Sequence, residues 1–240
     1  ERLRIIAVDQ LDAWWMPFWY DYLPAGQYAP WYNAMTQGLV LSFFVRLYHA
    51  TGDQQHLDAA DRVFASFERL GQSEDPWVAY VDGRRFLWLE HYPLPEPDHV
   101  LNAHLHAVFG IYEYWQATRS PAARQLLNGA VTTMRKNLPE YRRPGGISLY
   151  GLTTRTKNPK YHEIHVWQLN LLARLSGDEY FATMASNLRD DRRPVGRVNG
   201  RPQRHDVNIV GPHCRPSLPS SPDPAVTDAG DPEAQQVALP

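Results

Sequence analysis

Apolar side chains recur along the chain at intervals of three and four residues, the spacing of one face of an α-helix. A first run follows Trp31 and comprises Val40, Phe43, Phe44 and Leu47. The run stops at Thr51-Gly52-Asp53, where a glycine suits the end of one helix and an aspartate caps the next. The inward face of that next helix is made by Leu57, Ala60, Phe64 and Phe67. The pattern predicts a helical hairpin.

The same arrangement returns twice further along the chain. The second helical hairpin opens with an apolar face of Leu101, Leu105, Val108, Phe109 and Tyr112. Its second helix starts at Ser120-Pro121, a capping residue followed by a proline suited to the first helical position, and is lined by Leu127, Ala130, Val131 and Met134. The third hairpin is marked by Ile164, Leu171, Leu172 and Leu175, then Ser176-Gly177-Asp178, then Phe181, Met184, Ala185 and Leu188.

The segments between these hairpins have a different character. Trp77 to Pro93 alternates apolar and polar residues around Asp82-Gly83, which is typical of a β-hairpin, and residues 145–160 are not helical. Helical hairpins joined by short β-hairpin excursions predict an all-α-dominated α/α toroid, whose excursions gather at one mouth. Three hairpins make an incomplete barrel, and the aromatic stretch 11–32 is expected to supply another wall. Strands do not alternate with crossover helices, which disfavours a parallel sheet.

Aromatic residues divide the chain into two parts. All 8 Trp, 13 Tyr and 8 Phe precede Asp191, and residues 191–240 hold nine of the 20 prolines. A segment without large apolar groups cannot offset its ordering entropy. We therefore expect a toroid domain over 1–190 and a disordered Pro/Arg-rich tail over 191–240. The aromatic density of the first part fits a large core or a cleft in which sugar rings pack on aromatic faces. Because the chain begins at Glu1, a fragment or a processed chain is expected.

Charge and composition exclude several classes of protein. With 24 basic and 26 acidic residues, the net charge of −2 argues against a nucleic-acid binder driven by bulk positive charge. The single cysteine, Cys214, excludes an intrachain disulfide framework. No apolar run reaches the length of about 18 residues that a membrane span requires. Glycine-rich phosphate loops are absent, so no nucleotide cofactor is indicated. His162 and His165 are three residues apart at a helix start, where a pocket wall or a solvated face is commoner than a metal site, and no metal is expected.

Three connecting segments each place a tyrosine at the boundary of an element, where a toroid builds its cleft. Tyr92 lies in Glu90-His91-Tyr92-Pro93, Tyr150 ends Gly146-Ile147-Ser148-Leu149-Tyr150, and Tyr161 opens Tyr161-His162-Glu163-Ile164-His165. From spacing alone, the simpler interpretation is three interfacial tyrosines whose hydroxyls face water.

Five motifs, in order over residues 28–190, resemble those of the D-glucuronyl C5-epimerases, which convert glucuronate to iduronate within heparan-type polymers. Trp31-Tyr32-Asn33-Ala34-Met35-Thr36-Gln37-Gly38 is similar to that family's Trp-Tyr-Ser-Ala-Met-Ala-Gln-Gly, and Glu90-His91-Tyr92-Pro93 to its Glu-Glu-Tyr-Pro. The remaining matches are Val100-Leu101-Asn102 with Gly110-Ile111-Tyr112, the segment ending at Tyr150, and Tyr161-His162 with His165 and Gln168-Leu169. The resemblance is to the C-terminal catalytic domain of the family, which is a helical toroid.

The resemblance implies that Tyr92, Tyr150 and Tyr161 lie at the reacting sugar. The family's glutamate before the first tyrosine is replaced here by His91, and Glu90 lies one residue earlier. The family's arginine after the second tyrosine is replaced by Thr153, and Arg155 is the nearest arginine. The catalytic candidates are thus Tyr92, Tyr150, Tyr161, His91 and Glu90, and the substrate-binding candidates are Arg155, His162, His165, Asn102, Gln37 and Trp31.

Inversion at C5 removes a carbon-bound proton beside a carboxylate and returns a proton to the opposite face of the ring. We assign Tyr161 and Tyr92 to opposite faces, with His91 or Glu90 assisting Tyr92 and Tyr150 holding the sugar or relaying a proton. The substrate carboxylate needs a cation or strong hydrogen-bond donors, for which Arg155, His162 and His165 are candidates. The reaction requires no cofactor.

The expected partner is an acidic polysaccharide of the glucuronan or heparosan type, and the resemblance also implies a homodimer and an extracytoplasmic or secretory-pathway location. A toroid-class uronate lyase is an alternative, because it begins with the same proton removal and then expels the C4 substituent. A hydrolase would need two carboxylates in the cleft, for which Glu90 and Glu163 are candidates. A non-catalytic polysaccharide-binding remnant is a third class. The order of the motifs favours the epimerase.

Overall fold

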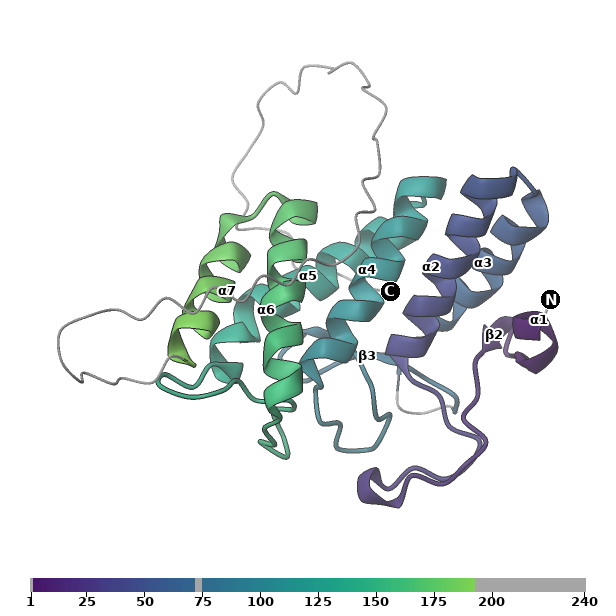
Figure 1. The fold of residues 1–240 in the computed structure, drawn as a ribbon. Coiled ribbons are helices and arrows are strands. Elements are labelled where there is room, and N and C mark those ends of the chain that lie inside the picture. The colour runs from purple at the N-terminus through teal and green to yellow at the C-terminus, as the bar shows by residue number, and fades with distance from the viewer. Residues whose placement is uncertain (1, 72–74, 193–240) are drawn as a thin grey trace, which may run out of the picture. The chain divides into compact units, whose positions relative to one another are not determined.

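The computed structural model describes residues 2–71 and 75–192 of the 240-residue chain (Figure 1). The helices of this part are α1 (Arg2–Ile6), α2 (Ala34–Thr51), α3 (Gln54–Glu68), α4 (Leu101–Thr118), α5 (Pro121–Tyr141), α6 (Pro159–Ser176) and α7 (Glu179–Asp191), with a 3₁₀ turn η1 (Leu23–Ala25). Its strands form two antiparallel pairs, β1 (Val8–Gln10) with β2 (Ala13–Trp15) and β3 (Ala79–Val81) with β4 (Leu87–Leu89).

The three predicted helical hairpins are confirmed as α2–α3, α4–α5 and α6–α7. Their turns use the expected chemistry. Gly52 and Gly177 both end a helix with φ of 70°, in the left-handed region that glycine tolerates. Asp53 and Asp178 then cap the following helices by accepting backbone N–H bonds. At both places the glycine ends one helix and the next residue, an aspartate, caps the following helix, so the chain reverses direction within two residues.

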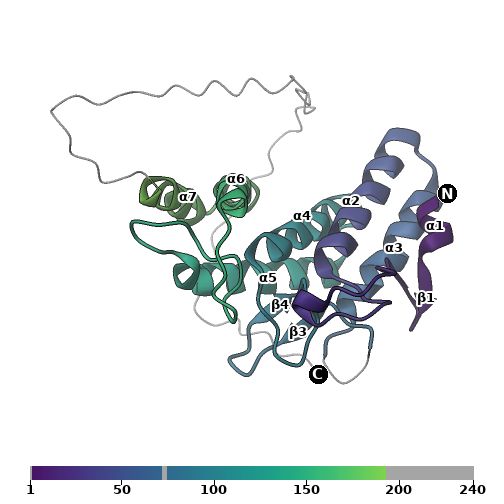
Figure 2. The ribbon, with the colours of Figure 1, turned by 60° about the horizontal axis from the view of Figure 1, so that its bottom comes forward.

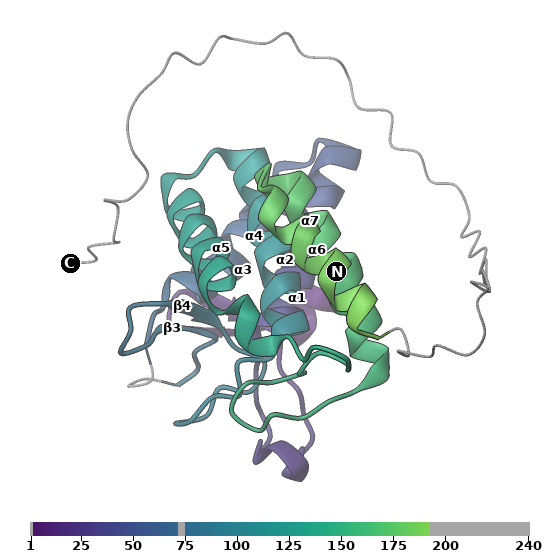
Figure 3. The ribbon, with the colours of Figure 1, turned by 90° about the vertical axis from the view of Figure 1, so that its left-hand side faces the viewer.

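Helices α2, α4 and α6 lie side by side, with α3 and α5 behind them and α7 beside α6 (Figures 1 and 3). The contact between α2 and α4 is a backbone contact: a Cβ built on Gly110 would lie 2.2 Å from the Gly38 carbonyl oxygen. Two glycines therefore let these two helices touch. Alternation of one layer of helices with a second layer is the α/α-toroid arrangement, and three hairpins make an incomplete toroid, as predicted.

The first turns of α2 and α4 are tied to the connecting segments. The Ala34 N–H donates to the Glu90 carbonyl at 2.8 Å, and the Leu101 N–H donates to the Tyr150 carbonyl at 3.0 Å. These bonds satisfy amides that have no partner within their own helices. The loops that precede α2, α4 and α6 consequently gather at one end of the helical layer, seen at the bottom of Figure 1.

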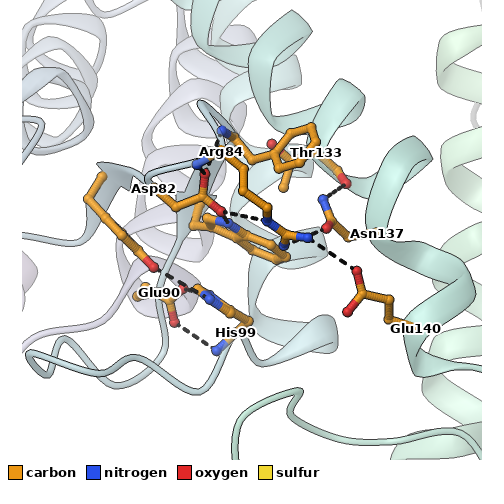
Figure 4. Close-up of polar contacts among 10 residues, drawn as sticks. Asp82, Arg84, Glu90, His99, Thr133, Asn137 and Glu140 are labelled. Carbon is orange, nitrogen blue, oxygen red and sulfur yellow. Dashed lines mark hydrogen bonds and ion pairs between the residues drawn. The ribbon is translucent and has the colours of Figure 1, made fainter.

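The β3–β4 hairpin that enters this end is fixed to α5, which Figure 4 shows in close-up. Arg84 in its turn donates to Asn137 at 2.9 Å, and Asp82 accepts from the Trp88 indole at 3.0 Å. Register pairs Tyr80 with Trp88. The hairpin predicted around Asp82-Gly83 is confirmed, and its attachment to α5 fixes where the following segment begins.

The sequence prediction needs correction at some points. Phe43, expected in the buried face of the first helix, is exposed, and Leu41 and Val45 are buried with Val40 and Phe44, because α2 packs between α3 and α4. Residues 11–32 do not form one wall: β2 packs on α3, and residues 18–31 project as a loop (Figure 3), whereas Figure 2 views the same end of the helices from below. The predicted boundary between residues 190 and 191 stays a prediction: α7 ends at Asp191, Arg192 follows, and residues 193–240 lie outside the described part. Among the described helices, none is long and apolar enough to cross a membrane.

Candidate active site

Three tyrosines from three connecting segments lie together at the end where the helices begin. The rings of Tyr150 and Tyr161 have their centroids 4.6 Å apart at 51°. Burial raises the pKa values of Tyr92 and Tyr150, and each phenol also shifts the pKa of the other, so the two side chains lie close together. The structure thus brings together the three tyrosines that the family motifs singled out.

Backbone bonds and a close contact hold Tyr150. Its N–H donates to the Thr156 carbonyl at 2.7 Å, which closes the loop that carries Arg155. The next residue, Gly151, lies against Asp98: a Cβ built there would be 2.0 Å from the Asp98 carboxylate. Asp98 in turn accepts from the Thr154 N–H at 2.7 Å and the Thr154 hydroxyl at 2.9 Å. The loop bearing Tyr150 is therefore fastened to the segment before α4.

The environment keeps two of the phenols protonated. Burial raises the pKa of Tyr92 to about 12, although the neighbouring Tyr150 acts in the opposite direction. Burial raises the pKa of Tyr150 further, and the neighbouring phenols add to the shift. At neutral pH both groups carry their protons, so both are proton donors in the free site.

His91 takes the position of the family glutamate and packs against Tyr92, with ring centroids 4.4 Å apart. Its Nδ1 is buried without a hydrogen-bond partner among the described residues. Burial lowers the pKa of His91 to about 4, so the imidazole is neutral at pH 7. A neutral imidazole beside a phenol is able to accept a proton, which keeps His91 among the groups that assist Tyr92.

Glu90 is directed elsewhere. Its carboxylate is fully buried and contacts His99, whose Nδ1 lies 2.6 Å from Oε1 and whose backbone N–H donates to Oε2 at 3.2 Å (Figure 4). Trp88 stacks on the same imidazole at 4.0 Å, and the Tyr141 hydroxyl donates to the His99 carbonyl at 2.6 Å. Burial raises the pKa of Glu90, against the opposing effect of His99. Glu90 therefore holds the segment that follows Tyr92 rather than facing the tyrosines.

His162 and His165 are both held by Ser148. Both imidazoles are buried, and both point their Nδ1 atoms at the Ser148 hydroxyl, at 3.0 and 2.8 Å. The Ser148 N–H also donates to His162. Burial lowers the pKa of each, that of His165 to about 3, so neither supplies a positive charge at pH 7. Their Nε2 atoms are buried without a hydrogen-bond partner among the described residues, and their role as hydrogen-bond donors to the substrate stays a prediction.

Three exposed basic residues lie on the segment between Tyr150 and Tyr161 instead: Arg155, Lys157 and Lys160. Arg155 has a φ of 53°, so the loop places it in the left-handed region. The Lys160 ammonium lies 5.9 Å from the centroid of the Tyr161 ring. Sequence reasoning named Arg155 but missed Lys160, although its place beside Tyr161 in the sequence was available as a signal.

Two further substrate-binding candidates lie in the helix packing. The Gln37 amide is fully buried and used three times: Oε1 accepts from the Met16 N–H, and Nε2 donates to the Trp14 carbonyl and the Ser66 hydroxyl, all at 2.8 Å. Gln37 thus fixes the segment at β2 to α2 and α3. Asn102 is buried at the start of α4, where its backbone carbonyl accepts from the Gln168 side chain of α6 at 2.9 Å.

Trp31, in contrast, lies beside Tyr92. Its ring lies 6.3 Å from that of Tyr92 and 6.4 Å from that of Tyr22, with Phe18 stacked on it at 4.3 Å. Tyr22 also stacks on Tyr92 at 6.0 Å. Tyr22 was not predicted, because only the aromatic richness of the stretch, and no spacing, marked it. Within the described residues, no three His, Cys, Asp or Glu side chains converge as a metal site.

Fold and site together define an α/α-toroid domain with a tyrosine-lined site at the starts of its inner helices. A family model for the C-terminus of D-glucuronyl C5-epimerase matches residues 9–190, and the chain belongs to this family. A D-glucuronyl C5-epimerase of Caenorhabditis elegans is 25% identical over 205 residues, which are 77% of this chain and 31% of that protein. An uncharacterized protein of Methanocaldococcus jannaschii is 25% identical over 155 residues, 63% of this chain and 49% of that one.

The chain thus spans less than half the length of both relatives. Among solved structures, a cellobiose 2-epimerase of Spirochaeta thermophila aligns with a TM-score of 0.48 and 14% identity, over 65% of this chain and 42% of that chain. A D-mannose isomerase aligns with the same TM-score and identity, over 78% of this chain and 46% of that chain.

Proposed function

We propose that this domain inverts C5 of D-glucuronate to L-iduronate within an acidic, glycosaminoglycan-like polysaccharide, without a cofactor. The observation that carries the proposal is the placement of Tyr150 against Tyr161 and close to Tyr92. Membership of the C5-epimerase family supports it. The expected acidic polymer has exposed cations available in Arg155 and Lys160.

The proposed chemistry needs two proton carriers on opposite faces of the sugar ring. Tyr161, as phenolate, removes the proton from C5, and the electron pair of the C5–H bond passes into an enolate-like dianion of the carboxylate. Tyr92, which holds its proton because burial raises its pKa, then donates to C5 from the other face. Tyr92 is left as a phenolate, whose charge the nearby Tyr150 hydroxyl stabilises. Proton exchange with water restores both groups.

The carboxylate must be stabilised as negative charge grows on it. Arg155 and Lys160 are the proposed partners, because His162 and His165 are neutral and enclosed. Neutral His91 beside Tyr92 takes up or returns the proton of that phenol. Glu90 and Glu163, the two carboxylates that a hydrolase would use, are engaged with His99 and Arg192, which leaves the hydrolase alternative without its pair.

The test is incubation of the full chain with a non-sulfated glucuronate polymer in heavy water, followed by proton NMR and ultraviolet absorbance. Deuterium at C5 with iduronate signals and no unsaturated product is the expected result. Absorbance from a C4–C5 double bond would identify the lyase. Polymer binding without either signal would identify a non-catalytic domain.

A further inference from the structure

The loop between β2 and α2 is an ordered feature that the proposed chemistry does not use. We call residues 18–31 the aromatic arm. Its ends form an antiparallel bridge, in which the Phe18 N–H donates to the Trp31 carbonyl at 2.8 Å and the Trp31 N–H donates back at 3.2 Å. Nearer the tip, Tyr22 and Gln27 pair in the same way. The arm is a closed loop with its own backbone bonds, drawn in purple at the lower edge of Figure 1.

Large aromatic side chains of the arm face solvent. Trp19 is 66% exposed, Tyr20 54% and Tyr28 68%. Exposed rings of this kind are typical of a surface that binds a ligand, because tyrosine and tryptophan offer an apolar face together with a polar edge. The interior of the arm, by contrast, is closed by the buried Trp31, whose indole donates to the Tyr20 carbonyl at 2.9 Å.

The arm is continuous with the tyrosine site. The Tyr20 ring packs edge-on against Trp31 at 6.0 Å, and Trp31 and Tyr22 both contact Tyr92. At the tip, a Cβ on Gly26 would lie 4.0 Å from the Leu94 side chain, so the arm runs beside the segment that follows Tyr92. A ligand that occupies the site and extends along this side reaches the exposed rings.

The arm offers apolar ring faces and carries no positive charge. Its single charged residue, Asp21, accepts a hydrogen bond from the Ala29 N–H at 2.9 Å. The basic residues Arg155, Lys157 and Lys160 belong to the loop between Tyr150 and Tyr161. The aromatic rings and the basic residues thus belong to different segments. The rings suit the C–H faces of a uronate polymer, and the basic residues suit its carboxylates.

We propose that the aromatic arm binds the sugar residues next to the reacting uronate, with their rings stacked on Tyr20, Trp19 and Tyr28. The proposal rests on the proposed function for the identity of the polymer. It adds a binding surface outside the tyrosine site, and it predicts that affinity depends on the length of the polymer.

The experiment compares Trp19→Ala, Tyr20→Ala and Tyr28→Ala with the wild-type chain. Trp167→Ala is the matched control, because Trp167 is 53% exposed on α6 and packs on Phe109 rather than on the arm. KM for a long glucuronate polymer is expected to rise about tenfold in the arm variants, the effect of losing one aromatic anchor, with kcat unchanged. A glucuronate-containing disaccharide should show no change in KM, and Trp19→Phe should restore part of the loss.

Direct binding separates this proposal from the proposed function. Polymer binding is measured by calorimetric titration of the Tyr161→Phe chain with and without each arm substitution. Weaker binding in the arm variants supports the arm even if the wild-type chain shows no exchange at C5, a result that would refute the epimerase alone. Unchanged KM and unchanged binding overturn the arm. A concentration-dependent dimer that Trp19→Ala dissociates, with polymer binding intact, would instead identify the arm as a contact between copies.

Discussion

Replacement of Glu90 by alanine separates a positioning role from a catalytic one. The Glu90 carboxylate is fully buried and accepts two hydrogen bonds from His99, from the ring and from the backbone. His99 itself has a φ of 54° and is held further by Trp88 and Tyr141. Removal of the carboxylate leaves two buried donors of His99 without partners in the segment between Tyr92 and α4.

The magnitude follows from the burial. Breaking a buried, hydrogen-bonded pair by removing one member costs about 3–5 kcal/mol of the free energy of unfolding. For a domain of this size that corresponds to a fall in Tm of roughly 6–20 °C. In Glu90→Gln the amide oxygen accepts from one His99 donor and the NH2 group faces the other, so the cost is expected to be about 1–3 kcal/mol, below that of Glu90→Ala.

The assay is thermal unfolding followed by circular dichroism at pH 7.5. Glu163→Ala is the matched control, because Glu163 is exposed and paired with Arg192, and such a surface pair contributes about 0–1 kcal/mol. Exchange at C5 is measured in parallel. Glu90→Gln should retain exchange within about tenfold, whereas loss of a catalytic acid or base costs about 10²–10⁴ in rate. Equal Tm values for the Glu90→Ala and Glu163→Ala variants would refute the structural role, and loss of exchange with full stability in Glu90→Gln would make Glu90 catalytic.

Three further predictions concern acid, helix contact and charge. Burial lowers the pKa of His91 and His104 to about 4 and that of His165 to about 3, so between pH 6.5 and 4 the unfolded chain binds more protons than the folded one. The free energy of unfolding should therefore fall as the pH is lowered through this window, and an equal urea midpoint at pH 7 and pH 5 would contradict this. Gly110→Ala should lower the free energy of unfolding by about 1–3 kcal/mol or more, because the new Cβ meets the Gly38 backbone. Gly129→Ala is the control and should have little effect, because its neighbour is the Leu87 side chain. Equal denaturation midpoints for the two variants would contradict a close backbone contact between α2 and α4. Lys160→Gln and Arg155→Gln should each raise KM for an acidic polymer about fivefold and weaken the salt dependence of KM. Lys136→Gln on α5 is the control and should leave KM unchanged. An unchanged KM in the Lys160→Gln and Arg155→Gln variants would show that these two residues do not bind the polymer.

The helical hairpins were predictable because their signals are local. Apolar spacing, Gly52, Asp53 and Ser120 act within a few residues of the turns that they make, and the structure has those turns. The stripe on α2 was misjudged at Phe43 because spacing defines a face, whereas the neighbours decide how far round the helix that face extends. The short β1–β2 pair was missed because three-residue strands carry little periodicity.

In the site, too, local signals were predictable and contacts between distant segments were not. Its tyrosines were found by motif order, but the directions of the side chains depend on contacts distant in sequence. Glu90 faces away from Tyr92 because His99 adopts a left-handed backbone that returns both of its donors to the carboxylate. His162 and His165 are enclosed because the loop at Ser148 folds onto α6. No spacing in the sequence reports either event.

The central claim is that Tyr161 and Tyr92 serve opposite faces of C5. The most direct measurement follows a polymer deuterated at C5 of its glucuronate residues in ordinary water, with Tyr161→Phe and Tyr92→Phe beside Tyr48→Phe, in the last turn of α2, as the control. We predict that Tyr48→Phe exchanges and inverts like the wild type, that Tyr161→Phe keeps its deuterium, and that Tyr92→Phe loses deuterium while the sugar remains glucuronate, because the base still acts and the opposite donor is gone. Inversion at the wild-type rate in either the Tyr161→Phe or the Tyr92→Phe variant would contradict the claim.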